Sequence, residues 1–159
     1  RSVVLTVGPM KSPAMDQSHL LELYRVMYTA RQVDAAEQQL ASRGEAFFHV
    51  SGAGHESTAM VARHLTPDDW LHCHYRSRAL LLARGVTPRK FFDNTLCKDA
   101  STSQGRRMGP FFSEPRLRIL SMVTPVGNNA LQSVGVAAAQ RDPEPLGNRG
   151  NGQYHSGGK

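Results

Sequence analysis

The chain has 159 residues, 40% of them hydrophobic and 20% charged, a balance typical of a globular domain large enough to bury a core. Its net charge of +6 suits a phosphate-bearing ligand, an acidic surface or nucleic acid without choosing among them. No apolar run approaches the ~20 residues of a membrane-spanning helix, and we expect no signal peptide.

The first predicted element is a long amphipathic helix over residues 18–43, preceded by an N-terminal arm over residues 1–17. Ser18 can cap this helix and Gly44 follows its end. Apolar side chains recur along it at roughly helical spacing: Leu20, Leu23, Tyr24, Met27, Tyr28, Val33 and Leu40.

A glycine-punctuated turn follows in the stretch "HVSGAGHE", residues 49–56, and a second helix is predicted at about residues 55–65. His49 and His55 flank the turn, whose backbone amides can face a ligand. The alternative is an ordinary helix start with a satisfied histidine. No second histidine follows Glu56 at the spacing of a metalloprotease motif.

The segment "WLHCHY", residues 70–75, is predicted as a short buried strand. On a strand, His72 and His74 share one face and could chelate a metal, although no third ligand is evident, and ordinary strand residues are the alternative. Cys73 and Cys97 have neither metal-type nor disulfide-framework spacing, so we expect inert thiols in a reducing compartment.

A Tyr75-Arg76 pair opens the next predicted helix, at about residues 76–84. A guanidinium and a phenol hydroxyl near a helix N-terminus can bind an anion, and the alternative is a solvated helix start. Arg84, near the end of the same helix, is expected to be exposed.

The second half of the chain adds a helix at about residues 88–96, a loop over residues 98–116 and a strand, "LRILSMV". Pro88 stands at the first position of that helix. A final helix over residues 128–141 has a face of small residues, and a Gly/Asn-rich tail or loop covers residues 143–159. Backbone groups at the strand-to-helix turn before the final helix can meet a ligand, as in doubly wound folds.

Taken in order, residues 18–142 resemble the N-terminal part of the alpha subunit of the thiamine diphosphate-dependent first component of 2-oxo acid dehydrogenase complexes. Their order and spacing are specific, although no single motif is. Gly-Arg-x-Met favours the branched-chain type, and "SGAGHE" resembles bacterial members in which alpha and beta halves are fused. Three stretches carry the resemblance: "LYRVMYTARQVDAAEQQLASRGEAFFHVSGAGHESTAM", "DDWLHCHYRSRALLLARG" and "SQGRRMGPFFSEPRLRILSMVTPVGNNALQSVGVAAAQR".

The resemblance implies an α/β, thiamine diphosphate-binding fold, a parallel sheet flanked by helices, of which residues 18–142 form the helix-rich N-terminal part. It implies oxidative decarboxylation of a branched-chain 2-oxo acid or pyruvate, with acyl transfer to a lipoyl group. The implied partners are a beta subunit or beta half and a lipoyl-bearing second component, in a homo- or hetero-oligomer away from membranes, with nucleic acid disfavoured. The implied compartment is the bacterial cytoplasm or the mitochondrial matrix.

The same resemblance assigns roles to individual residues. Tyr75 and Arg76 would hold the diphosphate of thiamine diphosphate, and His49 would lie near the substrate end of the cofactor as a catalytic residue. Thr124 and Val126 would meet the aminopyrimidine, largely through backbone groups. A potassium ion would be held by the carbonyls of Val123 and Pro125 and the side chains of Asn128 and Asn129, where the family has Thr and Gln.

Some of the family's features differ or are missing in this sequence. His55 stands where the family has Gln, and Phe111 stands where it has a His. The Gly-Asp-Gly…Asn motif that holds Mg²⁺ does not follow Arg141, so the chain looks like a fragment.

We therefore expect the chain on its own to lack 2-oxo acid decarboxylase activity, because neither the metal motif nor the partner half is present. Turnover of 3-methyl-2-oxobutanoate by the purified chain, supplied with thiamine diphosphate and Mg²⁺, would contradict this.

Two other functions stay open at this level. A basic nucleic-acid-binding domain is supported by the net charge of +6 and by the loop over residues 98–116. A non-catalytic domain of the same fold, retained for assembly or regulation, is the other. Arginines that converge with Tyr75 on one cleft favour a cofactor, whereas arginines spread along one exposed face favour nucleic acid.

Overall fold

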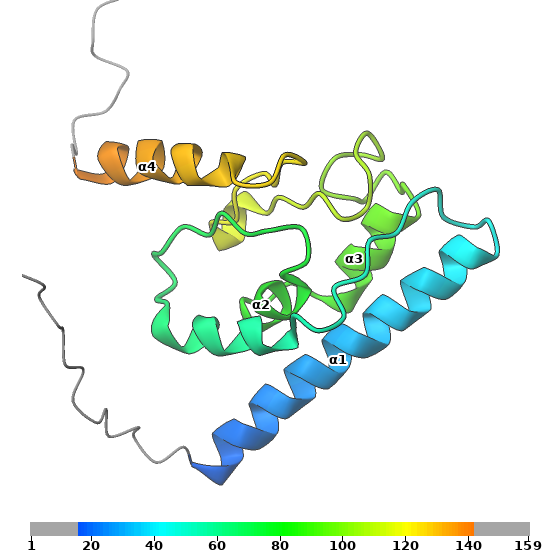
Figure 1. The fold of residues 1–159 in the computed structure, drawn as a ribbon, viewed down its shortest axis with the longest axis horizontal. Helices are drawn as coiled ribbons and strands as arrows, with labels where there is room; N and C mark the ends of the chain where they lie inside the picture. Colours follow the sequence, from blue (N-terminus) through cyan, green and yellow to red (C-terminus); the bar gives the residue numbers. More distant parts are fainter. Residues whose placement is uncertain (1–15, 142–159) are drawn as a thin grey trace, which may run out of the picture. The chain divides into compact units, whose positions relative to one another are not determined.

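The computed structural model describes residues 16–141, whose elements follow in the order α1, η1, α2, α3, η2 and α4 (Figure 1). The chain divides into two units, the first ending at Thr124 and the second beginning at Pro125. The predicted tail over residues 143–159 and most of the predicted arm lie outside the described residues. None of the helices within residues 16–141 is long and apolar enough to cross a membrane.

Helix α1, Gln17–Ser42, confirms the predicted first helix. Asp16, in extended conformation, occupies the N-cap position, and Ser18 lies inside the helix with its hydroxyl donating to the Asp16 carboxylate. The capping role predicted for Ser18 is therefore wrong. Gly44 follows the helix end as expected, with a φ of +74° that a side chain would disfavour.

The buried face of α1 agrees only in part with the predicted apolar pattern. Val33 is buried with Ala30, Asp34 and Glu37, and Leu23 and Met27 pack against the buried alanines. Leu20, Tyr24 and Tyr28 of the same pattern are exposed. The apolar periodicity predicted the helix correctly. The fully buried residues of α1 all lie in its second half.

Three further helical segments pack against α1, and two of them, η1 and α2, also pack against each other. They are η1, a 3₁₀ helix over Glu56–His64, α2, Arg78–Ala83, and α3, Pro88–Thr95. The predicted helices are confirmed in place, although the second is 3₁₀ rather than α. Ala30, Ala59 and Ala79 are buried together and let α1, η1 and α2 approach closely.

The two predicted strands do not form within residues 16–141, whose β-pairing consists of isolated bridges. Leu71 and Ile119 form a parallel bridge, in which the Leu71 N–H donates to the Arg118 carbonyl at 2.8 Å and the Leu120 N–H donates to the Leu71 carbonyl at 2.8 Å. The two segments thus lie side by side and parallel. A ladder needs further strands to propagate, and the described residues supply none, so the parallel sheet stays a prediction.

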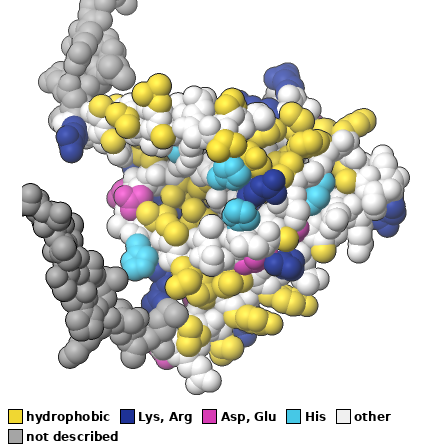
Figure 2. Space-filling view, in the orientation of Figure 1, with side chains coloured by type: hydrophobic (Ala, Val, Ile, Leu, Met, Phe, Trp, Pro, Cys, Tyr) yellow, Lys and Arg dark blue, Asp and Glu magenta, His cyan; other side chains and the backbone are white. Residues whose placement is uncertain are grey.

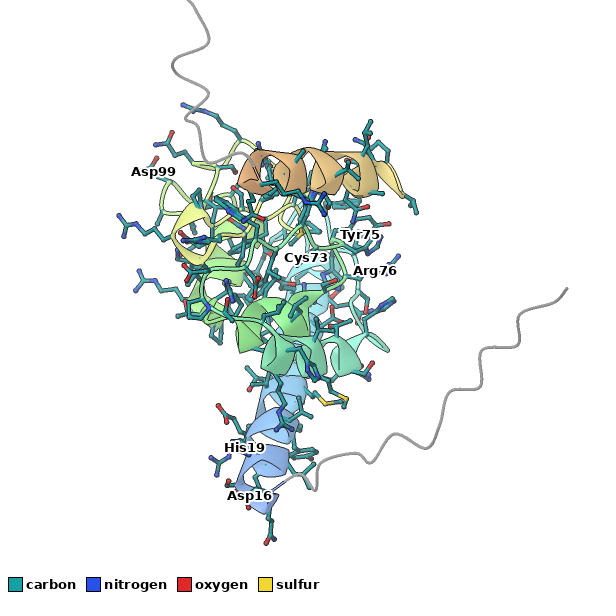
Figure 3. The ribbon with its side chains drawn as sticks, turned by 90° about the vertical axis from the view of Figure 1, so that its left-hand side faces the viewer. Asp16, His19, Cys73, Tyr75, Arg76 and Asp99 are labelled. Carbon is teal, nitrogen blue, oxygen red and sulfur yellow. The ribbon has the colours of Figure 1, made fainter. Side chains whose placement is uncertain are left out.

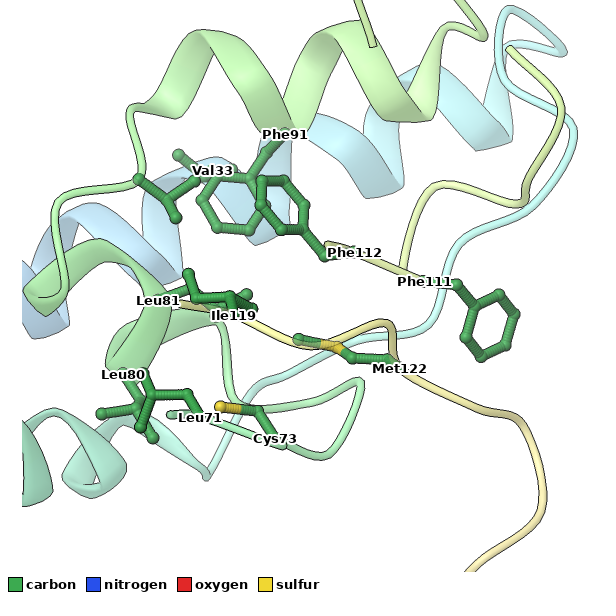
Figure 4. Packing of buried hydrophobic residues seen from close by; sticks show 11 residues of the cluster. Val33, Leu71, Cys73, Leu80, Leu81, Phe91, Phe111, Phe112, Ile119 and Met122 are labelled. Atoms are coloured by element: carbon green, nitrogen blue, oxygen red, sulfur yellow. The ribbon is translucent and has the colours of Figure 1, made fainter. Parts of the chain in front are cut away.

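The core of the first unit gathers around Phe112 and Ile119, each about 1% exposed (Figure 4). The Phe91 and Phe112 rings pack with centroids 5.5 Å apart. Residues 98–116 form a loop with only the start of η2, Pro115–Leu117, inside it, yet Phe111 and Phe112 anchor this loop in the core.

Burial makes one of the two thiols inert, as predicted for both. Both cysteines are free. Cys73 is buried in the core, and burial raises its pKa to about 11, which leaves it protonated and unreactive at neutral pH.

Helix α4, Asn128–Arg141, confirms the predicted last helix and buries none of its residues. A side chain added at Gly135 would meet open space. We expect Gly135→Leu not to lower the thermal stability of the chain, because leucine favours a helix more than glycine does. We expect the same change to disturb assembly, because the leucine would overpack the contact with a helix of a partner.

Thermal unfolding by circular dichroism and light scattering of the full-length enzyme measure these two effects separately. Gln140→Leu, on another side of α4, is the matched control. Normal assembly of the Gly135→Leu enzyme would show that this face does not pack on a helix.

Candidate functional site

The Tyr75-Arg76 pair lies in the turn that leads into α2, whose N-cap residue is Ser77. The half-buried Tyr75 ring meets Phe111 edge-on, with centroids 5.9 Å apart at 70°, and lies against His74 at 3.9 Å. The Arg76 Cζ lies 5.5 Å from the centre of the Tyr75 ring. Figure 3 shows the two residues next to each other at one edge of the first unit.

The Arg76 guanidinium is bound to backbone rather than to an acid. Its Nη1 donates to the Ser51 carbonyl, and no carboxylate pairs with it among residues 16–141. Some other arginines of the first unit do pair with acids, as Arg31 does with Glu56 at 2.7 Å. A partly buried guanidinium that keeps its charge and most of its donors suits an anionic ligand.

His74 adds a neutral imidazole next to this pair. The Arg76 backbone N–H donates to His74 Nδ1 at 3.2 Å, so Nδ1 is unprotonated and Nε2 carries the proton. Burial lowers the pKa of His74, and the nearby charges of Arg76 and His55 lower it further. At neutral pH the ring can therefore donate one hydrogen bond without adding charge.

The glycine turn singled out in the sequence comes directly against Arg76. The Ser51 hydroxyl donates to Asp34 Oδ2 at 2.7 Å, and the Gly52 N–H donates to Asp34 Oδ1 at 2.9 Å. A Cβ added at Gly52 would lie 3.0 Å from the Arg76 carbonyl oxygen. Glycine is needed here because the turn and the Arg76 backbone nearly touch.

A buried ion network lies behind this turn. The Arg78 guanidinium reaches both Asp34 and Glu37, and the Thr95 hydroxyl donates to Glu37 Oε1 at 2.6 Å. The Arg78, Asp34 and Glu37 side chains are 8%, 5% and 3% exposed. These contacts tie α1 to α2 and α3.

The two carboxylates of the network respond differently to burial. Burial raises the pKa of Glu37 above its ordinary value, with Arg78 and Thr95 opposing it. For Asp34, burial is outweighed by hydrogen bonds from Ser51 and Gly52 and by Arg78, so its pKa is lowered. Asp34 is thus the firmly ionised member.

His49, the predicted catalytic residue, lies beside this network with its side chain 10% exposed. Its Nε2 is 3.5 Å from Asp34 Oδ1 and its Nδ1 is 3.7 Å from Glu37 Oε2. One ligand atom from each of these three residues lies within 4.8 Å of the others, as in a metal site. Because the Arg78 guanidinium already bridges both carboxylates, a metal cation there would face its positive charge.

The alternative metal site at His72 and His74 gains no support. Within residues 16–141, the group of three possible metal ligands is the one at Asp34, Glu37 and His49. The His74 Nδ1 already accepts the Arg76 N–H. Among the described residues, no third ligand joins this pair.

Comparison with known proteins gives this site its context. The family model of the dehydrogenase E1 component matches residues 24–153 of the chain. This chain belongs to the dehydrogenase E1 component family.

Its curated relatives agree with one another in name. The 2-oxoisovalerate dehydrogenase subunit alpha of Bacillus subtilis is 30% identical over 125 residues, covering 76% of this chain and 38% of that protein. The mitochondrial subunit alpha 1 of Arabidopsis thaliana is 26% identical over 117 residues, covering 73% and 25%. The mitochondrial subunit alpha of Caenorhabditis elegans is 25% identical over 134 residues, covering 84% and 31%. The chain thus spans between 25% and 38% of the length of these relatives.

Membership of the E1 family implies a thiamine diphosphate-binding fold, of which the described residues are a helix-rich part. Tyr75 and Arg76 belong to the first unit, as does the exposed Thr124. Val126, 82% exposed, belongs to the second. That these four residues contact one cofactor therefore stays a prediction.

The remaining predicted ligands lie around the turn into α4. The Pro125 carbonyl accepts the Asn128 N–H at 3.3 Å, so one of its lone pairs is already used. Val123 lies next to Thr124, the last residue of the first unit, and Asn129 lies in the first turn of α4. The potassium site at these residues also stays a prediction.

The sequence analysis missed Asp34, Glu37 and Arg78 in this E1 family chain. A signal was present, since two acids three residues apart share the helical face of Ala30 and Val33. Charged residues on an apolar face are normally paired when buried. The partner, Arg78, could not be chosen among 19 Lys and Arg residues.

Proposed function

We propose that this chain is the alpha-type portion of a thiamine diphosphate-dependent 2-oxo acid dehydrogenase. Its substrate would be a branched-chain 2-oxo acid, with pyruvate second, and the acyl group would pass to a lipoyl group. The family match and three relatives named 2-oxoisovalerate dehydrogenase support this. The observation that carries the proposal is the Arg76 guanidinium, which lies beside Tyr75 and has no acid partner among residues 16–141. Such a guanidinium suits the two negative groups of a diphosphate.

Thiamine diphosphate, when bound, supplies the stabilisation of the carbanion that decarboxylation requires. The chain's part is to bind and orient. Arg76 donates charge-assisted hydrogen bonds to phosphate oxygens, and the Tyr75 hydroxyl adds one more. Phe111 fixes the Tyr75 ring by its edge-on contact. Thr124 and Val126 meet the aminopyrimidine through backbone groups.

His49 is the proposed catalytic residue at the substrate end, and its ring nitrogens lie 3.5 Å from Asp34 and 3.7 Å from Glu37. Mg²⁺ would be held by residues outside this chain. K⁺ would be held by the carbonyls of Val123 and Pro125 and the side chains of Asn128 and Asn129.

The proposed assembly pairs this portion with a beta subunit or beta half in an oligomer and delivers the acyl group to a lipoyl-bearing second component. The complete domain would contain a parallel sheet flanked by helices, and the parallel bridge of Leu71 and Ile119 supports this arrangement. The proposed compartment is the bacterial cytoplasm or the mitochondrial matrix, in keeping with the bacterial and mitochondrial relatives.

The nucleic-acid alternative has less support. Figure 2 shows Lys and Arg side chains at separate places on the viewed face rather than in one continuous patch. Several arginines have partners within the chain, Arg31 in Glu56, Arg78 in two acids and Arg118 in Asp68.

Titration of the full-length enzyme with thiamine diphosphate and Mg²⁺ tests the proposal, together with acyl transfer from 3-methyl-2-oxobutanoate to a lipoylated carrier domain. Thiamine without phosphates is the control ligand and is expected to bind far more weakly. Cofactor binding without turnover would favour the non-catalytic domain of the same fold. Failure to bind thiamine diphosphate would contradict the proposal.

A further inference from the structure

We propose that Asp34 is a positioning residue for Arg76 and acts through the turn at Ser51 and Gly52. The inference rests on the proposed function, in which the ligand of Arg76 is the diphosphate of the cofactor. Asp34 would not touch the cofactor itself. Its effect on binding would pass through the turn to the guanidinium.

Asp34 holds this turn with both of its carboxylate oxygens. Oδ2 accepts the Ser51 hydroxyl at 2.7 Å, and Oδ1 accepts the Gly52 N–H at 2.9 Å. The Ser51 hydroxyl oxygen in turn accepts the Ala53 N–H at 3.1 Å. Two consecutive residues of the turn are thereby fixed to one side chain of α1.

The turn then holds Arg76. The Ser51 carbonyl accepts a hydrogen bond from Arg76 Nη1. Within residues 16–141, the guanidinium makes no other hydrogen bond to the protein. This hydrogen bond restrains one nitrogen of the guanidinium, and because the guanidinium donors form a rigid fork, it also limits where the remaining donors can point.

Gly52 lies close to the Arg76 backbone. A Cβ added at Gly52 would be 3.0 Å from the Arg76 carbonyl oxygen, so a side chain there would crowd or displace Arg76. The turn therefore meets Arg76 twice, by the hydrogen bond from its guanidinium to Ser51 and by the close approach of Gly52 to its backbone.

Asp34 can perform this task because it is itself immobile. The Arg78 guanidinium pairs with its Oδ1, and Glu37, held by Thr95, fixes the other side of that guanidinium. A single carboxylate at 5% exposure thus joins the buried network to a half-buried arginine that has no acid partner among the described residues.

Thiamine diphosphate affinity of the full-length enzyme tests this chain of contacts. Asp34→Asn, Ser51→Ala and Gly52→Ala are each expected to weaken affinity, Gly52→Ala by about tenfold, because misplacing a binding group by a fraction of an ångström is costly. Ser42→Ala, which removes an exposed hydroxyl bonded to the Gln39 carbonyl, is the matched control and is expected to change nothing. Thermal unfolding is measured for each variant.

The same variants combined with Arg76→Ala separate positioning from general damage. If Asp34 and the turn act through Arg76, they have no further effect on affinity once Arg76 is alanine. Equal losses with and without Arg76, or no loss from Gly52→Ala and Ser51→Ala, would overturn the inference. These two variants leave the ion network intact and decide the matter if Asp34→Asn fails to fold.

An Arg76→Ala enzyme that binds thiamine diphosphate like the parent would overturn this inference and the diphosphate role together. An Arg76→Ala enzyme that binds weakly, beside turn variants that bind normally, would overturn only the inference.

Discussion

Replacing Arg76 by alanine in the full-length enzyme is expected to weaken thiamine diphosphate binding about ten- to a hundred-fold. The guanidinium would donate charge-assisted hydrogen bonds to phosphate oxygens in a half-buried place, and losing one such bond costs roughly 1.5–3 kcal/mol. No acid of the described residues competes for its charge. Titration calorimetry or fluorescence quenching measures the dissociation constant.

Arg76→Lys is expected to be impaired as well. A lysine keeps the charge but loses the planar fork that bonds the Ser51 carbonyl while facing a ligand, and it stacks less well over the Tyr75 ring. Dissociation constants of both variants indistinguishable from the parent's would remove the diphosphate role from this pair.

The control for this experiment has to be chosen from the structure. The sequence suggests Arg84 as an exposed arginine of the same helix, but this expectation is wrong. Arg84 donates to the carbonyls of Leu117, Thr66, Pro67 and Asp69 and so fastens two loops together. Arg89, whose side chain is 85% exposed, is the appropriate control, and Arg89→Ala should leave affinity unchanged.

Replacing Arg78 by alanine is expected to destabilise the fold by roughly 3–5 kcal/mol, because it leaves two buried carboxylates without their cation. For a chain of this size that corresponds to a fall in melting temperature on the order of 10 °C or more. Arg89→Ala serves again as the control, since the Arg89 side chain is exposed and its partner Asp93 is 3.7 Å away.

The penalty of Arg78→Ala should depend on pH. In the parent, the lowered pKa of Asp34 contributes stability above its unfolded pKa, and this contribution is lost as the pH falls through the folded value. Burial gives Glu37 a raised pKa, so its ionisation costs stability as the pH rises. Without Arg78 both carboxyls retain protons more readily in the folded state.

We therefore expect the difference in unfolding free energy between parent and Arg78→Ala to be larger at pH 7 than at pH 4. Urea denaturation at the two pH values measures it. An equal penalty at both would show that Arg78 contributes through packing rather than charge.

Local sequence signals predicted the helices because their causes are local. Thr87 and Pro88 set the start of α3 within two residues, and Gly44 follows the end of α1 at a positive φ. The two predicted strands do not form within residues 16–141, because strand formation depends on residues that are distant in the chain. A strand needs a hydrogen-bonded neighbour, and Leu71 finds only the single bridge to Ile119.

By itself, the sequence determined the helix positions, the Tyr75-Arg76 pair and the glycine turn, because each depends on residues adjacent in the chain. Tertiary structure alone decided that Asp34 lies between the turn and Arg78, and that Arg76 is left without an acid of its own among the described residues. Residues 34 and 78 are brought together by packing of α1 against α2, and residue 51 joins them because its loop lies against α1. Which guanidinium is neutralised inside the core, and which keeps its charge for a ligand, depends on distances that no local pattern records.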